Sequence, residues 1–154
     1  MGASCSAMHV DRMVCQVVCD LGDLPFKASQ GAAGYDLRAK LPCDVVLQPG
    51  AIYLASTGVQ LAIPRGFEGQ IRSRSGLARQ GVVVLNAPGT IDSDYRGVVM
   101  VLLINHGDKD FTIKNGERIA QLVFARCVDT TFSFASNLEP TVRNTNGLGS
   151  TGMV

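Results

Sequence analysis

V-V-V-L-N-A-P-G-T-I-D-S-D-Y-R-G-V-V-M-V-L-L-I-N (82–105) is the stretch that decides the fold. Two runs rich in Val, Leu and Ile, at 82–85 and 98–105, flank a segment that contains Pro, Gly, Asp and Asn. Apolar, β-branched runs bounded by turn-forming residues predict strands rather than helices. The run 98–105 carries no polar residue before Asn105, so we expect this strand to be buried on both faces.

The rest of the chain repeats this alternation of short apolar segments and turns. Working outward, we expect strands at 13–18, 35–39, 45–47, 69–72, 111–113 and 119–124, and two more on either side of Thr57 and Gly58. Only S-G-L-A-R-Q (75–80) predicts a helical turn. Seventeen glycines and six prolines fit many tight turns. The sequence therefore predicts an all-β sandwich or jelly roll with one short helix.

Length, composition and charge narrow the class of protein. With 154 residues, 46% of them hydrophobic and 18% charged, the chain predicts one folded domain. A formal net charge of +1 without a long basic run argues against nucleic-acid binding. No apolar run reaches the roughly 18 residues that would span a membrane. Five cysteines without a C-x-x-C spacing, and no signal-peptide pattern, predict free thiols and a cytoplasmic location, or a nuclear one in a eukaryotic or viral host.

The two ends of the chain differ from its middle. We expect an unstructured tail at 1–12, the β-domain at 13–136, and a flexible arm at 137–154, where the hydrophobic content falls. The first residues, MGASCS, also match the myristoylation pattern formally, with Cys5 available for palmitate. The sequence leaves both a plain tail and lipidation open.

Five segments place polar residues at turns between the expected strands. They are A-G-Y-D-L-R-A (33–39), R-S-R-S-G-L-A (72–78), N-A-P-G-T-I-D-S-D-Y-R-G (86–97), G-E-R-I-A-Q-L-V-F (116–124) and R-N-T-N-G-L-G-S-T-G (143–152). In the first, Asp36 would hold a hydrated cation or cap a turn. In the second, Arg74, Ser75 and Gly76 would cradle a phosphate or form an ordinary helix cap.

The other three segments also allow two interpretations each. The carboxylate Asp92 could deprotonate a water, or it could serve a β-turn. The polar Gln121 inside an apolar run needs hydrogen-bond partners, which a ligand or a neighbouring strand would supply. The glycine-rich end provides donors for phosphate oxygens but lacks the Walker pattern, and a disordered tail has similar composition.

Taken in this order, the five segments resemble the five motifs of the trimeric dUTPase family. The match runs from about Val14 to Gly152, and the strings P-G-T-I-D-S-D-Y-R-G and G-L-G-S-T-G make it specific. The resemblance implies a distorted jelly-roll-like fold and a homotrimer with shared active sites. It also implies Mg²⁺-assisted hydrolysis of dUTP to dUMP and pyrophosphate, which limits uracil in DNA and supplies dUMP for thymidylate synthesis.

The resemblance also implies a role for each site residue. Asp92 would be the general base that activates water for attack on the α-phosphorus, and Gln121 would contact the α-phosphate or that water. Tyr95 would lie against the deoxyribose, main-chain groups of 89–100 would read the uracil, and Asp36 would hold Mg²⁺ through a water. The implied substrate-binding residues are Arg74, Ser75, Gly76, Asn86, Gly89, Thr90, Ile91, Tyr95, Met100, Arg143, Leu148, Gly149, Ser150 and Thr151.

Two positions depart from the family's pattern. Leu148 stands where many members have a Phe that stacks on uracil, and Ser73 stands where a Pro is common. Two other functions stay open on this sequence: a nucleotide-binding regulatory protein with weak or no turnover, and a relative of dCTP deaminase. For the deaminase alternative, the sequence shows no motif that would handle the cytosine amino group. Neither of the two departures, Leu148 and Ser73, removes a reacting residue.

Overall fold

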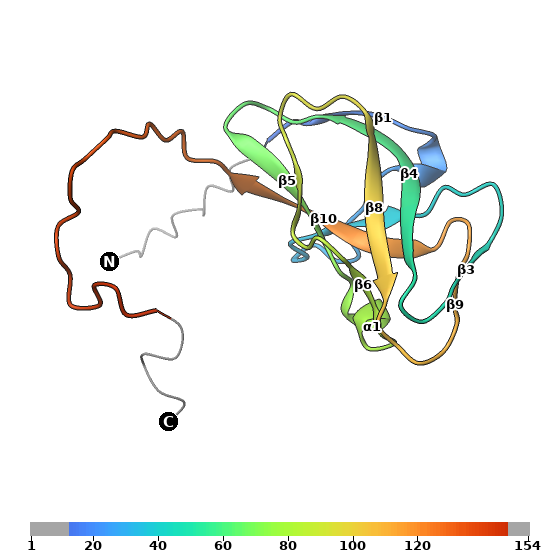
Figure 1. Cartoon of the computed structure of the whole chain (residues 1–154). Helices are drawn as coiled ribbons and strands as arrows, with labels where there is room; N and C mark the ends of the chain where they lie inside the picture. Colours follow the sequence, from blue (N-terminus) through green and yellow to red (C-terminus); the bar gives the residue numbers. More distant parts are fainter. Residues whose placement is uncertain (1–12, 148–154) are drawn as a thin grey trace, which may run out of the picture.

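Antiparallel strands build the whole body of the protein in the computed structural model, which describes residues 13–147 (Figure 1). One sheet has the order β1-β4-β8-β6 and consists of Gln16–Val18, Ile52–Ala62, Val98–Asn105 and Val82–Val84. A second sheet has the order β2-β10-β5-β7 and consists of Tyr35–Arg38, Arg118–Arg126, Phe67–Arg72 and Gly89–Ile91. A small sheet pairs β3 (Val45–Leu47) with β9 (Phe111–Ile113).

Helical structure in the described part of the chain is short. The α-helix α1 spans Ser75–Ala78, and a 3-10 helix, η1, spans Leu21–Asp23. None of the helices between residues 13 and 147 has the length and apolar character needed to cross a bilayer. The predicted all-β fold with one short α-helix is confirmed.

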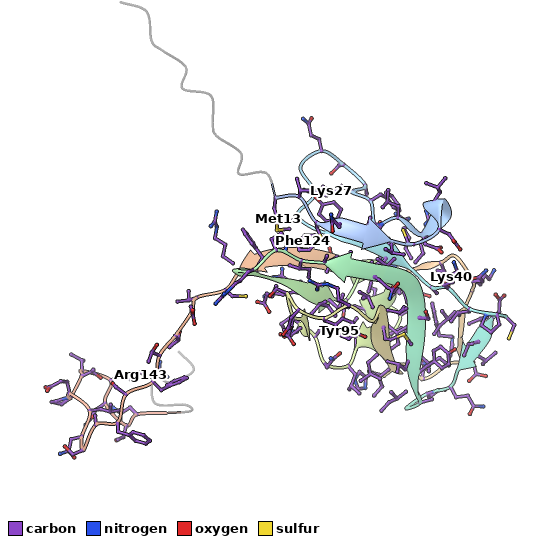
Figure 2. The ribbon with its side chains drawn as sticks, turned by 90° about the horizontal axis from the view of Figure 1, so that it is seen from above. Met13, Lys27, Lys40, Tyr95, Phe124 and Arg143 are labelled. Carbon is purple, nitrogen blue, oxygen red and sulfur yellow. The ribbon has the colours of Figure 1, made fainter. Side chains whose placement is uncertain are left out.

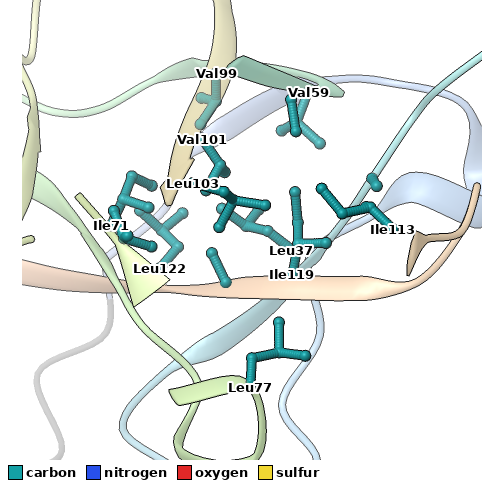
Figure 3. Packing of buried hydrophobic residues seen from close by; sticks show 14 of the residues in the cluster. Leu37, Val59, Ile71, Leu77, Val99, Val101, Leu103, Ile113, Ile119 and Leu122 are labelled. Carbon is teal, nitrogen blue, oxygen red and sulfur yellow. The ribbon is translucent and has the colours of Figure 1, made fainter. Parts of the chain in front are cut away.

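The core lies between the two large sheets. Figure 3 shows Val101 and Leu103 of β8 facing Leu122 of β10 and Ile71 of β5 across this interior. Each of these side chains is at most 2% exposed. Because successive side chains of a strand point to opposite faces, their neighbours on β10 and β5 are left on the outer face of the second sheet.

The region around Thr57 differs from the expectation of two strands. β4 is one continuous strand of eleven residues, Ile52–Ala62, with a change of register where Ser56 pairs with Met100 and Gln60 pairs with Val98. Gly58 has a φ of 68°, which glycine adopts without strain. The turn-like residues Thr57 and Gly58 therefore form a bulge inside the strand, and a bulge bends a strand without ending it.

The deciding stretch 82–105 also shows two differences. Val98–Asn105 forms a strand with the expected bounds, but only its last three residues are buried on both faces; Met100 is 36% exposed. Within the segment 86–97, which we expected to be a turn, Gly89–Ile91 forms β7 and pairs with β5. The hydrophobic pattern did not predict this strand because it has only three residues and begins with Gly.

The last part of the described chain leaves the body of the protein. β10 ends at Arg126, and residues 127–147 form no helix or strand and run outward from the two sheets (Figure 1). This segment carries exposed apolar side chains, such as those of Phe132 and Phe134. The expected boundaries at residues 13 and 137 stay predictions. The expected N-terminal tail, 1–12, and four site residues of the last motif, Leu148, Gly149, Ser150 and Thr151, lie outside the described residues.

Candidate active site

A polar pocket of about 350 Å³ gathers residues from the first, second and fourth motifs. It lies where the end of β5 and the start of α1 meet β2 and β10. Its lining consists of Ala28, Ala32, Ala33, Gly34, Asp36, Arg74, Ser75, Gly76, Arg118 and Gln121. Five of these, Asp36, Arg74, Ser75, Gly76 and Gln121, are residues that the sequence predicted for the site, so one pocket brings them together.

An ion-pair triad organises this pocket. The Nε of Arg74 lies 2.9 Å from one carboxylate oxygen of Asp36, and an Nη of Arg118 lies 3.0 Å from the other. The second nitrogen of the Arg74 fork donates to the backbone oxygen of Arg118 at 3.0 Å. The Asp36 side chain is only 12% exposed, so its charge is largely removed from water. The two arginines compensate it and leave the triad with a net positive charge.

Gln121 is positioned by the sheet and by a backbone contact. It lies opposite Asp36 of β2 and opposite Arg72 of β5 in the strand registers. Its Nε2 donates to the backbone oxygen of Ser73 at 3.0 Å, which satisfies the amide nitrogen of this half-buried side chain. The Oε1 atom lies against Gly34: a Cβ there would come within 2.5 Å of it. Gly34 therefore leaves the room that the Gln121 amide occupies.

The third motif and the strand that follows it form a hairpin-like segment whose two strands, β7 and β8, belong to different sheets. β7 pairs with β5, whereas β8 pairs with β4 and, from Leu103 onward, with β6. The backbone oxygen of Leu102 accepts from Leu85 on the side opposite β4. Since backbone groups alternate in direction along a strand, Met100 and Val98 also direct their N–H and C=O groups away from β4.

Side chains of the third motif pack closely around its turns. The Asn86 amide lies over Gly89, where a Cβ would come within 3.2 Å of its Nδ2. The Tyr95 hydroxyl donates to the backbone oxygen of Val98 at 3.0 Å, and its ring covers Gly97, where a Cβ would clash with it. Tyr95 still exposes 43% of its surface. Its ring therefore has a fixed position and an open face.

The other predicted residues that lie within 13–147 are not in the polar pocket. Asp92, Thr90 and Asn86 are exposed on the third motif, and Ile91 is half-buried beside them. Arg143 lies on the outlying segment, far from Tyr95, as Figure 2 shows. Its Nε donates to the backbone oxygen of Asn146 at 3.1 Å, so its described contact is local. The predicted residues thus fall into three groups on one chain: pocket, third motif and C-terminal segment.

A larger pocket, of about 760 Å³, lies elsewhere and has different chemistry. Met13, Lys27 and Phe124 mark it in Figure 2, at the end of the body where the N-terminal strand passes β10. Apolar side chains line most of it, with Lys27 5.1 Å from the centre of the Tyr35 ring. It contains no carboxylate and none of the predicted site residues, so size alone does not mark the site of chemistry.

Sequence reasoning missed Arg118. This residue precedes the apolar run of the fourth motif and has the appearance of an ordinary charged residue at a strand end. The structure instead places its guanidinium on Asp36 and in the lining of the polar pocket. No local signal marks it, because residues three apart in a regular strand point to opposite faces. The register irregularity between Arg118 and Ala120 is what allows Arg118 and Gln121 to line the same pocket.

Metal-binding groups are sparse in residues 13–147. No cluster of three or more His, Cys, Asp or Glu side chains occurs among them. Asp36 is the only carboxylate in the polar pocket. Such a donor set does not fit an all-protein metal cage, but it does fit a cation that arrives with most of its ligands from a bound phosphate chain.

Comparison with known proteins supports the resemblance to the dUTPase family. The dUTPase family model matches residues 20–152. The deoxyuridine 5'-triphosphate nucleotidohydrolase of Caulobacter vibrioides is 54% identical over 84% of this chain and 86% of that protein. The enzyme of the same name from Mesorhizobium japonicum is 53% identical, over 85% of this chain and 83% of its own.

Solved structures agree on the fold. The dUTPase of Staphylococcus bacteriophage 80alpha with dUpNHpp is similar with a TM-score of 0.81 and 25% identity, over 90% of this chain and 98% of that one. The dUTPase of phage phi11 of S. aureus has a TM-score of 0.73 at 22% identity, over 82% of this chain and 99% of that one. The family model, the close relatives and the shared fold together mean that the chain belongs to the dUTPase family.

Proposed function

We propose that the chain hydrolyses dUTP to dUMP and pyrophosphate with Asp92 as the general base for the attacking water. The carboxylate follows β7 directly and is exposed, so a water and a substrate can both reach it. An aspartate accepts a proton from a water that is held between it and a phosphorus atom. Dependence of the rate on this one side chain is the chemical core of the proposal.

The base-reading role rests on the separation of β7 and β8. Each strand has one edge on which no partner strand pairs among the described residues. For β7 it is the edge opposite β5, and for β8 it is the edge opposite β4, from Val98 to Met100. Main-chain donors and acceptors on both edges can therefore bind a ligand. A uracil edge carries alternating acceptors and a donor, which such backbone edges match. These unpaired backbone edges are the single observation that supports recognition of the uracil edge by the main chain.

The sugar role follows from Tyr95. Its hydroxyl is held by Val98, and its ring has an open face beside the third motif. A ring fixed in this way packs against the apolar edge of a deoxyribose, and a 2′-hydroxyl would collide with it. Tyr95 therefore favours dUTP over UTP.

The phosphate chain is assigned to the polar pocket. Arg74, Ser75 and Gly76 would bind the phosphate chain there, with the Ser75 hydroxyl near the α–β bridge, and Gln121 would contact the α-phosphate or the attacking water. We assign Mg²⁺ to this pocket as well, with Asp36 holding it through a water, because a carboxylate oxygen in an ion pair retains a further lone pair. When bound, such a cation would neutralise charge that develops on the departing pyrophosphate.

The magnesium assignment rests on the charge of the triphosphate and not on a comparison. A variant of the phage phi11 dUTPase is described as coordinating a structural Mg(II) ion. That protein is 22% identical to this chain, so its metal is not transferred to this one. The negative charge of a triphosphate by itself favours a bound divalent cation.

A homotrimer with shared active sites accounts for the separation of the predicted residues. The polar pocket, the third motif and Arg143 occupy separate places on one chain, and the C-terminal segment runs away from its own body (Figure 2). A second and a third copy would supply the missing parts of each site, with Arg143, Ser150 and Thr151 closing on the γ-phosphate. Light scattering coupled to size-exclusion chromatography measures the number of chains, and a monomeric active enzyme would contradict the trimer.

A nucleotide panel tests the function. We expect pyrophosphate release from dUTP, little from UTP, dTTP or dCTP, and loss of the dUTP reaction on addition of a chelator, restored by Mg²⁺. Release of ammonia from dCTP would point to the deaminase alternative. A wild-type chain that binds dUTP without turnover, with an equally inactive Asp92→Asn variant, would point to a regulatory nucleotide-binding protein.

A further inference from the structure

We propose that the bulge in β4 is the support that fixes the base- and sugar-reading segment, with Thr57 and Gln60 as positioning residues for specificity. The bulge consists of residues 57–59, which lie opposite the single residue Val99 because the register moves from Ser56–Met100 to Gln60–Val98. It therefore faces the part of β8 that precedes Met100. The inference rests on the proposed function of that segment in reading uracil and deoxyribose.

At the bulge, the side chain of Thr57 makes hydrogen bonds in place of the regular backbone hydrogen bonds between β4 and β8. Its side chain is fully buried, and its hydroxyl donates to the backbone oxygen of Val99 at 2.7 Å. The same hydroxyl accepts from the backbone N–H of Val59 at 3.2 Å. One side chain thus satisfies both strands where the extra residues interrupt the regular bonds. Removal of this hydroxyl leaves a buried donor and a buried acceptor without a partner.

The contact with Val99 sets the direction of its neighbours. Val99 turns its carbonyl toward β4, so Val98 and Met100 turn theirs to the opposite side. The oxygen of Val98 accepts from the Tyr95 hydroxyl, and the main-chain N–H and C=O of Met100 lie on the edge of β8 that faces away from β4. The residue that Thr57 holds, Val99, is therefore the direct neighbour of Val98, which binds Tyr95, and of Met100, on the base-reading edge.

Gln60 makes a second connection to the same segment. Its Nε2 donates to the backbone oxygen of Arg96 at 2.9 Å. The Arg96 guanidinium in turn donates to the backbone oxygens of Ser93 and Tyr95, each at 2.7 Å. The loop that carries Tyr95 is thus held to β4 at Arg96 and closed on itself by the same residue. Both connections start from β4, although neither Thr57 nor Gln60 would touch the substrate.

Substitution of Thr57 tests the proposal, because valine has nearly the same shape without the hydroxyl. For Thr57→Val we expect kcat/KM for dUTP divided by that for dTTP to fall about tenfold, because a base-reading edge that loses its fixed position no longer excludes the 5-methyl group of thymine. Thr57→Ser keeps the hydroxyl and should keep the ratio of the wild type. Ile113→Val in the small sheet also lowers stability, by removing a buried methyl group, and should leave the ratio unchanged.

Gln60→Leu provides a second variant outside the fully buried core, and it decides the matter if Thr57→Val does not fold. We expect its preference for dUTP over UTP to fall about threefold while its melting temperature stays near the wild type. A folded Thr57→Val with the wild-type dUTP-to-dTTP ratio would overturn the proposal, as would an unchanged dUTP-to-UTP ratio in Gln60→Leu.

The wild-type panel separates this inference from the proposed function. If the wild-type chain does not prefer dUTP over dTTP and UTP, the reading of the nucleotide by the third motif is wrong, whatever the bulge variants do. If the wild type is selective and the bulge variants are equally selective, the function stands and only the supporting role of β4 is lost.

Discussion

Gly34 and Gln121 lie in such close contact that a methyl group on the first would reach within 2.5 Å of the side-chain oxygen of the second. The Gln121 amide can occupy the polar pocket only because residue 34 has no side chain. Since Oε1 is the far end of a flexible side chain, an added methyl group would displace it rather than break the sheet. The relationship therefore concerns catalysis more than stability.

We expect Gly34→Ala to lower kcat about tenfold, because a displaced Gln121 no longer orients the α-phosphate or the water. The melting temperature should fall by only a few degrees, since rotation of the Gln121 side chain relieves the contact with Oε1, and the 3.2 Å contact with its Cβ requires only a small shift. Steady-state kinetics and thermal unfolding measure both. Gly31→Ala is the matched control, because nothing lies within 4 Å of a Cβ there. Wild-type kinetics in Gly34→Ala would contradict the role assigned to Gln121.

Asp92→Asn should lower kcat by about 10² to 10⁴, the range expected for loss of a general base. The side chain is exposed, so the substitution should leave the free energy of unfolding nearly unchanged. Single-turnover measurement of dUTP hydrolysis separates the chemical step from product release. Asp94→Asn, two residues away and also exposed, serves as the control and should keep most of the activity. Similar losses in both variants would indicate a general effect of charge on this loop.

Asp36→Asn should raise KM for dUTP and destabilise the fold, because Arg74 and Arg118 would then face each other without the carboxylate between them. A cost of about 1–3 kcal/mol in the free energy of unfolding is expected for a largely buried charged partner. Arg118→Gln should cost less, since its side chain is 41% exposed and an exposed ion pair contributes about 0–1 kcal/mol. Urea unfolding and KM measurements test this order.

The exposed Arg79, just after α1, provides the control for the triad. Arg79→Gln should change neither KM nor stability measurably, because it removes a positive charge, as Arg118→Gln does, but at a site outside the pocket. A variant Asp36→Asn with wild-type KM and stability would mean that the triad does not organise the phosphate site.

Thiol reactivity gives a prediction that is independent of catalysis. Burial raises the pKa of the Cys15 thiol, against a smaller lowering by its hydrogen bond to the backbone of Ala62. The thiolate is the reacting form, so Cys15 should be alkylated by iodoacetamide more slowly near neutral pH than the exposed Cys43 and Cys127. Peptide mass spectrometry over time measures the rates. In urea the difference should vanish; equal rates in the native protein would contradict the burial of Cys15.

Much of the fold was predictable because most strands carry their own signal. The run 98–105 has no competing interpretation, and β8 has these bounds. The β4 bulge was not predictable in the same way: Thr57 and Gly58 favour a turn locally, and only the long partner strand β8 keeps the chain extended through them. β7 has three residues and begins with Gly, so it becomes a strand through its pairing with β5 and not through propensity.

The candidate site divides in a similar way. Motif letters identified Asp36, Arg74 and Gln121, which the structure brings into one pocket. They did not identify Arg118, because its role depends on the register that places β10 beside β2. Nor did they reveal that both oxygens of Asp36 hold guanidinium groups, since an ion pair of residues 82 positions apart in the chain has no local signature.

The triad in the polar pocket has a consequence for substrate capture. Arg74 would otherwise be a long side chain with many rotamers, and a ligand would have to restrict them on binding, at a cost of about 0.5–1.5 kcal/mol for such a side chain. Its fork is already held by Asp36 and by the backbone of Arg118 before any nucleotide arrives. The ordering is therefore completed during folding, and an incoming polyanion meets a receptor that is preorganised for it.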